Sequence, residues 1–155
     1  EMSVEPFLIA SSVIGLMAQR LVRKVCTECT EARDLTPSEI SSLGLTQEQY
    51  LHLSEQAGMF NDALRQAPPK GKAFKPVGCG VCMGTGYSGR IGIYEVMPIS
   101  DTIKGHIMSN APVSVIKKTA VSDGMRTLRA DGALKIAAGL TSIEEVMRVT
   151  QEDVE

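Results

Sequence analysis

The 155-residue sequence has no tryptophan and only three tyrosines and three phenylalanines. Proteins that hold single-stranded nucleic acid stack its bases on several aromatic side chains, so this function is not expected. Neither sign of charge dominates, because 16 lysines and arginines face 18 aspartates and glutamates and the formal net charge is −2. A nucleic-acid surface needs a basic excess that binds phosphates. The composition therefore predicts no nucleic-acid partner.

A long apolar run is also missing. No stretch without a charged residue is longer than the one from Pro6 to Gln19, which is shorter than the about 20 residues of a membrane-spanning helix. Glu1 and Glu5 lie where a signal peptide carries positive charge. We therefore expect no membrane span, no secretion signal and a cytoplasmic location. The first residue is Glu1 rather than methionine, which indicates a fragment or a processed chain.

The motifs of several enzyme classes are absent as well. The sequence contains neither the phosphate-binding loop G-x-x-x-x-G-K-[ST] nor the zinc-protease motif H-E-x-x-H. The two histidines, His52 and His106, are interpreted as surface residues. The adjacent carboxylates Glu144 and Glu145 are interpreted as part of a solvated helix face. The sequence thus predicts no complete active site and no catalytic residue.

The segment from residue 4 to 24 is predicted to form one long helix. Ile9, Val13, Met17 and Leu21 recur at four-residue spacing, which is typical of one helix face. Other apolar side chains lie off this stripe, so the helix needs cover on most of its sides. We expect that cover to precede the segment in a longer protein, and an exposed apolar patch or self-association without it. The alternative is a central core helix of a self-contained domain.

Capping residues, prolines and glycines predict the other elements. Short helices follow capping boxes that begin at Thr36 and Thr46. A loop is expected from Gln66 to Pro76 and a strand from Arg90 to Met97. Four more helices are expected, near 101–109, 112–122 and 125–138 and after a capping box at Thr141. The predicted fold class is mainly α with a short β element.

All four cysteines fall into two Cys-x-x-Cys pairs, Cys26 with Cys29 and Cys79 with Cys82. Two such turns present four thiolates in a closed tetrahedral arrangement, which is the ligand set of a structural zinc site. Four cysteine ligands are also compatible with iron, but zinc is the more common occupant of such a site. The alternatives are two disulfides, which a reducing cytosol disfavours, and a redox motif, which needs only one pair. The second pair also resembles the zinc repeat of DnaJ-type co-chaperones, whose glycines the first pair lacks.

The zinc is expected to stabilise the middle of the chain and not its end. The residues between the two cysteine pairs include few large apolar side chains, whereas the C-terminal helices have their own caps and apolar stripe. Metal removal is therefore expected to unfold about 25–90 and to leave the C-terminal helices.

Several runs of residues carry a resemblance to a known family. They are VEPFLIASS from Val4, AQRLVR from Ala18, GTGY from Gly84, GRIGIYE from Gly89, GMRTL from Gly124, DG at Asp131, GLT from Gly139 and EEV from Glu144. In this combination and order the chain closely resembles the C-terminal part of the type II secretion and type IV pilus assembly ATPases. The resemblance covers nearly the whole chain and is weakest from about 31 to 75. Members of the related retraction branch generally lack the cysteine pairs, so the secretion or extension branch fits better.

The resemblance implies one part of a hexameric cytoplasmic ATPase that docks on platform proteins of the bacterial inner membrane. The phosphate loop, acidic residues and histidine box of the family lie upstream of the matching region. ATP and magnesium would therefore bind in the parent protein only, and this chain alone is predicted to be inactive. Residues 1–24 would be the last core helix of a RecA-like α/β motor domain, 25–90 a zinc-binding subdomain with a helical insert, and 91–155 a C-terminal helical subdomain.

Arg90 is the residue for which the resemblance implies a nucleotide role. It occupies the arginine position of a segment that lies close to the nucleotide base in the family, and a guanidinium can stack on adenine. The alternative is an arginine that pairs with a carboxylate on the strand surface. For the chain as a whole, the alternative is a free-standing tetracysteine zinc module that binds a protein partner.

Overall fold

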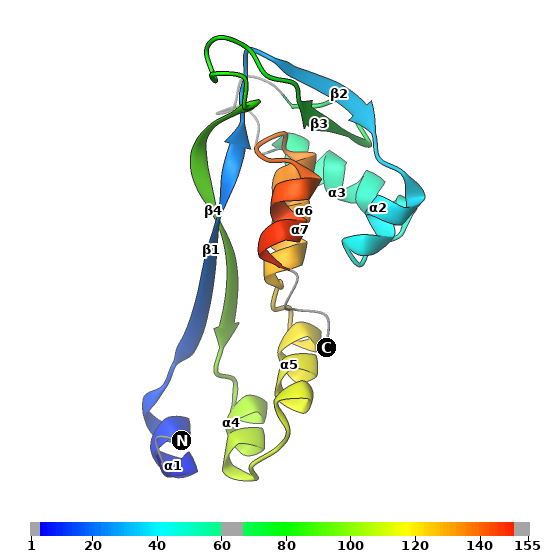
Figure 1. Cartoon of the computed structure of the whole chain (residues 1–155). Coiled ribbons are helices and arrows are strands. Elements are labelled where there is room, and N and C mark those ends of the chain that lie inside the picture. Colours follow the sequence, from blue (N-terminus) through cyan, green and yellow to red (C-terminus); the bar gives the residue numbers. More distant parts are fainter. Residues whose placement is uncertain (1–3, 60–66, 151–155) are drawn as a thin grey trace. The chain divides into compact units, whose positions relative to one another are not determined.

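The computed structural model describes residues 4–59 and 67–150. Within these ranges the chain forms seven helices and four strands (Figure 1). The helices are α1 (Pro6–Ser12), α2 (Pro37–Ser42), α3 (Gln47–Met59), α4 (Asp101–Met108), α5 (Val113–Ser122), α6 (Leu128–Ala137) and α7 (Ile143–Val149). The strands are β1 (Gly15–Val25), β2 (Thr30–Asp34), β3 (Lys72–Pro76) and β4 (Tyr87–Pro98). The fold is α/β, with two two-stranded sheets, β1 with β4 and β2 with β3, where one short β element was expected.

The prediction of one helix over residues 4–24 is wrong. Only α1 is helical, and after it the chain becomes the strand β1, which pairs with β4. Side chains four residues apart share a face in a helix and also in a strand, because four is a multiple of the two-residue strand repeat. The spacing of Val13, Met17 and Leu21 therefore does not distinguish the two structures. Gly15, which disfavours a helix interior, marks the change.

The chain divides into two compact units, each made of two separate stretches. Unit 1 comprises 1–19 and 94–127, and unit 2 comprises 20–93 and 128–155. The boundaries expected after residues 24 and 90 do not coincide with this division.

Unit 1 is a small helical unit with its own apolar core. Ile99, Ile103, Ala120 and Met125 are buried together, and Val13, Met97, Ile107 and Ile116 pack against them. The helix α1 packs on α4, and α4 packs on α5. The hydroxyl of Ser100 caps α4 by accepting the N–H of Ile103 at 3.4 Å. The predicted helices near 101–109 and 112–122 are thereby confirmed as α4 and α5.

Unit 2 contains the β2–β3 sheet, which pairs Thr30 with Pro76 and Asp34 with Lys72 in antiparallel register. The loop expected from Gln66 to Pro76 is therefore wrong for β3, while Gln66 itself lies outside the described residues. The prolines and the glycine of this segment predicted a loop. They could not indicate the strand, because its partner β2 lies about 40 residues earlier in the chain.

The short helices of unit 2 start as their capping residues predict. At α2, the Thr36 hydroxyl accepts the N–H of Glu39 at 3.2 Å, and the Glu39 carboxylate accepts the N–H of Thr36 at 2.8 Å. Thr46 and Gln49 form the same reciprocal pair at the start of α3. Both capping boxes are confirmed.

The capping box expected at Thr141 is wrong. The hydroxyl of Thr141 donates to the carbonyl oxygen of Arg23 at 2.8 Å, and the residue that precedes α7 is Ser142, whose hydroxyl bonds the phenol of Tyr87 at 2.9 Å. Both side chains are fully buried. They connect the start of α7 to the parts of β1 and β4 that belong to unit 2, in place of capping the helix.

Large apolar side chains are exposed along the first part of the chain. On α1 and β1 they are Phe7, Leu8, Leu16, Met17 and Leu21, and Ile14 between them is 91% exposed. An apolar patch was expected here, although on a helix. Exposed apolar side chains in such number are typical of a surface that another protein segment covers.

Candidate metal centre

The four cysteines come from two turns of unit 2. Cys26 directly follows β1 and Cys29 directly precedes β2, while Cys79 and Cys82 lie between β3 and β4. Cys26 and Cys82 are buried, and the other two are half-buried. Pairing of β2 with β3 brings the ends of these strands together, and with them the two turns. The four sulfurs lie within 4.8 Å of one another.

The spacing of the sulfurs fits a tetrahedral metal site. Cys82 Sγ lies 3.7 Å from Cys29 Sγ and 3.7 Å from Cys79 Sγ. A tetrahedral ion with metal–sulfur bonds of about 2.3 Å places its sulfurs about 3.8 Å apart. A disulfide would require about 2.05 Å between two sulfurs. The arrangement therefore suits four thiolates around one ion and does not suit two disulfides.

Backbone N–H groups surround the sulfurs. The N–H of Gly78 donates to Cys29 Sγ at 3.3 Å, and the N–H groups of Cys79 and Gly86 donate to Cys82 Sγ, each at 3.1 Å. Such donors stabilise the negative charge of a thiolate, which is the form that binds metal. These donors therefore favour the thiolate form of Cys29 and Cys82.

These contacts affect the thiols unequally. Burial raises the pKa of Cys82, but the N–H groups of Cys79 and Gly86 and the thiols of Cys29 and Cys79 outweigh it and lower that pKa to about 6. The pKa of Cys29 rises to about 11, because burial and the neighbouring thiols outweigh the Gly78 N–H. The two N–H donors thus favour the thiolate form of Cys82.

Two glycines allow the second turn. Gly78 has φ +112°, and a Cβ there would lie 2.5 Å from the carbonyl oxygen of Gly84. Gly86 has φ +74°, and a Cβ there would lie 2.6 Å from Pro76 Cβ. Real Cβ atoms do not come so close, and the left-handed backbone is unfavourable for other residues. The glycines beside the second pair are therefore structural parts of the cysteine site.

An ion network around one buried carboxylate lies elsewhere in unit 2. Glu145 is 1% exposed, and its carboxylate accepts the backbone N–H of Arg23 at 2.9 Å. The guanidinium groups of Arg23 and Arg148 bond the same carboxylate at 2.7 and 2.9 Å. The Arg23 guanidinium also lies 4.0 Å from the ring centroid of Tyr87.

The interpretation of Glu145 as a solvated carboxylate is wrong. Burial raises its pKa, but the bonds from Arg23 and Arg148 lower it to about 2. Arg148 lies three residues after Glu145 in the same helix, a spacing that indicates an ion pair between the two. Arg23 is 122 residues away in sequence, and no local pattern predicts such a contact.

Arg90 lies in an open pocket of about 280 Å³ in unit 2, lined by Arg23, Thr85, Tyr87, Gly89 and Arg90. Among the described residues, the side chain of Arg90 has no hydrogen-bond or ion-pair partner. The pairing with a strand carboxylate that was the alternative for Arg90 is therefore not seen there.

No helix in the described ranges is long and apolar enough to cross a bilayer.

Comparison with known proteins identifies relatives over nearly the whole chain. The type IV pilus assembly ATPase TfpB of Acinetobacter baylyi is 38% identical over 149 residues, which are 96% of this chain and 22% of that protein. The type II secretion system protein E of Pectobacterium carotovorum is 36% identical over 154 residues, 99% of this chain and 26% of that protein. The type IV pilus assembly ATPase PilB of Thermus thermophilus is 37% identical over 152 residues, 98% of this chain and 15% of that protein.

The chain thus spans about a quarter or less of the length of these curated relatives. The model of one family, type II/IV secretion system protein, matches residues 1–148. The resemblance inferred from the sequence motifs is confirmed, and the chain belongs to the type II/IV secretion system protein family.

Proposed function

We propose that this chain is part of an ATPase that powers type II secretion or the assembly of type IV pili. The observation that carries this proposal is identity of 36–38% to proteins of those names over 96–99% of the chain. Within the parent protein the chain has a structural and interaction role. The chemistry of ATP hydrolysis belongs to other parts, because this sequence has no phosphate-binding loop.

The place of the chain in the parent follows from the family resemblance. The chain is the C-terminal part of a hexameric ATPase that works on the cytoplasmic side of the bacterial inner membrane. ATP and magnesium bind upstream of it. Residues 1–24 complete the motor domain, 25–90 form the zinc-binding subdomain, and 91–155 follow as the C-terminal subdomain. The exposed apolar side chains of α1 and β1 support a partner segment in the parent.

Cys26, Cys29, Cys79 and Cys82 hold one structural zinc ion in this proposal. Support comes from the 3.7 Å sulfur separations and from the backbone N–H groups around Cys29 and Cys82. Four protein ligands leave no open position, so the ion would stabilise the loops and take no part in catalysis. Bound zinc would fix the two cysteine turns together.

Metal analysis of the purified chain tests this assignment. We expect one zinc per chain, and four thiols that resist alkylation until a chelator removes the metal. Cobalt in place of zinc should give the visible absorption of tetrahedral sulfur coordination. A metal-free protein with two disulfides, or with thiols that alkylate freely in the presence of zinc, would contradict it.

Arg90 is proposed to contact the nucleotide base in the parent. Its guanidinium borders an open pocket and can stack on adenine. In the full-length ATPase, Arg90→Ala should raise the KM for ATP several-fold with a smaller effect on kcat. Lys24→Ala, an adjacent change that removes a cation outside this pocket, is the control. An unchanged KM for ATP in the Arg90→Ala variant would contradict a contact between Arg90 and the nucleotide base.

The cellular function is tested in the organism that encodes the chain. Deletion of the full-length gene should abolish either the release of a secreted protein or surface pili, and the readout that is lost identifies the system. Complementation with Cys79→Ser should fail, whereas Gly80→Ala should restore function, because a Cβ at Gly80 meets no atom within 4 Å. Normal secretion and piliation in the deletion strain would refute the proposal.

A further inference from the structure

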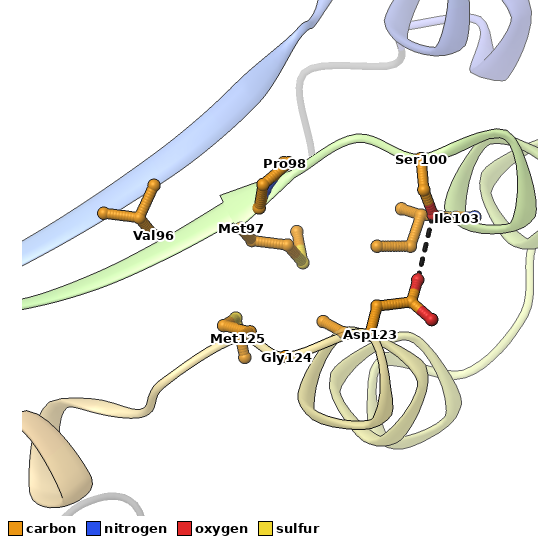
Figure 2. Close-up of a pocket in the computed structure, with 9 residues that line it drawn as sticks. Val96, Met97, Pro98, Ser100, Ile103, Asp123, Gly124 and Met125 are labelled. Atoms are coloured by element: carbon orange, nitrogen blue, oxygen red, sulfur yellow. Dashed lines mark hydrogen bonds between the residues drawn. The ribbon is translucent and has the colours of Figure 1, made fainter.

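Unit 1 contains a second concave site, separate in the sequence from the cysteines and from Arg90. It is a pocket of about 250 Å³ between the end of β4, the start of α4 and the turn after α5 (Figure 2). Its lining residues are Val96, Met97, Pro98, Ser100, Ile103, Ala120, Asp123, Gly124 and Met125. Figure 2 shows Met97 and Met125 on opposite sides of this space.

The chemistry of the lining is one-sided. The walls are mostly apolar, with two methionines, and Asp123 is the only charged residue among the nine. The Asp123 carboxylate accepts one hydrogen bond, from the Ser100 hydroxyl at 3.1 Å (Figure 2). Among the described residues, its second oxygen has no partner. Asp123 is exposed, so this oxygen is open to water or to a ligand at the mouth of the pocket. An apolar pocket with one such carboxylate favours a ligand that is apolar over most of its length and cationic at its end.

The size of the pocket limits the ligand further. Small-molecule and cofactor sites usually measure about 300–1,000 Å³, so this pocket is smaller than the usual range. It suits one long side chain better than a whole metabolite. Methionine walls adapt to such a side chain, because the unbranched thioether fills irregular space. Val96 is 51% exposed and extends the apolar surface from the pocket to the solvent.

We propose that this pocket is a docking site for an arginine or lysine side chain of a protein partner. The aliphatic stem would pack between Met97, Ile103 and Met125, and the cationic group would reach Asp123. Complementarity of charge and of apolar length identifies this occupant. The proposal does not depend on the zinc site or on the ATPase assignment.

Binding of short peptides to the full 155-residue chain tests the proposal. The probe is acetyl-Gly-Arg-Gly-amide, and the reporters are the ¹³C-labelled methyl groups of Met97 and Met125, followed by NMR. Two matched peptides separate the contributions: citrulline in place of arginine keeps the stem without the charge, and 2,3-diaminopropionate keeps a charge with a shorter stem. We expect saturable shifts of both methyl signals with the arginine peptide, and clearly weaker binding of the other two.

Two variants test the role of the carboxylate. Asp123→Asn should weaken binding of the arginine peptide about three- to fivefold, the effect of losing a partly exposed ion pair. Asp101→Asn is the matched control, because Asp101 is an exposed carboxylate of α4 that does not line the pocket. Both variants must give the folded spectrum of the parent chain. The proposal is overturned by equal binding of all three peptides, by no shift at Met97 and Met125, or by equal affinities of the two variants.

Discussion

Glu145 is a buried carboxylate whose pKa makes stability depend on pH. Its folded-state pKa of about 2 lies below the about 4.3 of an unfolded glutamate. The folded state therefore gains stability from this group above the unfolded pKa, and loses that gain as pH falls through the folded value. The expected window of loss is about pH 5 to 2.

Glu145→Gln is predicted to lower the free energy of unfolding at pH 7 by about 2–3 kcal/mol, because two guanidinium groups lose their shared anion. Denaturant titrations of wild type and variant with the same metal content, at each pH from 7 to 3, would measure it. The difference between the two proteins should shrink as pH falls. Glu144→Gln is the control, since its side chain is 57% exposed. A constant difference at all pH values would contradict the assigned pKa.

Gly86 is a second residue with a predictable effect. Gly86→Ala would introduce a Cβ within 3.0 Å of the Pro76 carbonyl carbon at φ +74°. A left-handed backbone costs a non-glycine residue about 1–2 kcal/mol, and movement of the Gly86 N–H would weaken its bond to Cys82 Sγ. In competition with a chelator, Gly86→Ala should therefore bind zinc at least about tenfold more weakly than the parent chain does.

The control for Gly86 lies in the same loop. Gly80 is between Cys79 and Cys82, yet it has no positive φ and a Cβ there would contact nothing within 4 Å. Gly80→Ala should keep nearly the affinity of the parent chain. Equal losses in the two variants would show that loop flexibility, and not the geometry at Gly86, sets the affinity.

At the scale of elements, the structure changes what metal removal should do. The helices α6 and α7 were expected to fold without the metal, but they belong to unit 2 with the cysteines. α6 packs on α3 and β3, and Gly132 of α6 approaches Val146 of α7 closely. The helices α4 and α5 have a separate core in unit 1.

Chelation of the metal is therefore predicted to remove hydrogen-exchange protection from β2 and β3 and to lower it in α6 and α7. Protection of α4 and α5 should persist, because their core includes none of the four cysteines. Hydrogen exchange followed by mass spectrometry would resolve these segments. Unchanged protection of β2 and β3 after metal removal, or an equal loss in α4 and α5, would contradict the prediction.

At the scale of the whole molecule, the chain alone is predicted not to hydrolyse ATP. It spans 15–26% of the length of the relatives compared and contains no phosphate-binding loop. Without that loop and its magnesium, the transferred phosphoryl group has no stabilising contacts. A phosphate-release assay should give no turnover above buffer with the purified chain, and magnesium-dependent turnover with the full-length protein. Turnover that stays constant per mole of chain through successive purification steps would refute it.

Local sequence patterns determined much of this protein. The two cysteine pairs predicted a four-sulfur cluster, and Thr36 and Thr46 predicted helix starts. Each helix start, and each Cys-x-x-Cys pair taken alone, depends on residues within a few positions of one another. The two pairs are far apart in the sequence, and their union was predicted from the chemistry of a four-thiolate metal site. The family motifs likewise predicted membership that the comparisons confirmed.

Only the tertiary structure decided the features that depend on distant partners. Residues 15–25 form a strand because β4 pairs with them, although their four-residue spacing fits a helix equally well. The charge of Glu145 can be buried because Arg23, 122 residues away, donates hydrogen bonds to its carboxylate from the backbone N–H and from the guanidinium. Asp123 and Met97 share a pocket because the chain returns from α5 to the end of β4. In each case the stabilising contact joins groups that are far apart in the sequence. A short window of residues contains only one of the two groups and therefore cannot predict the contact.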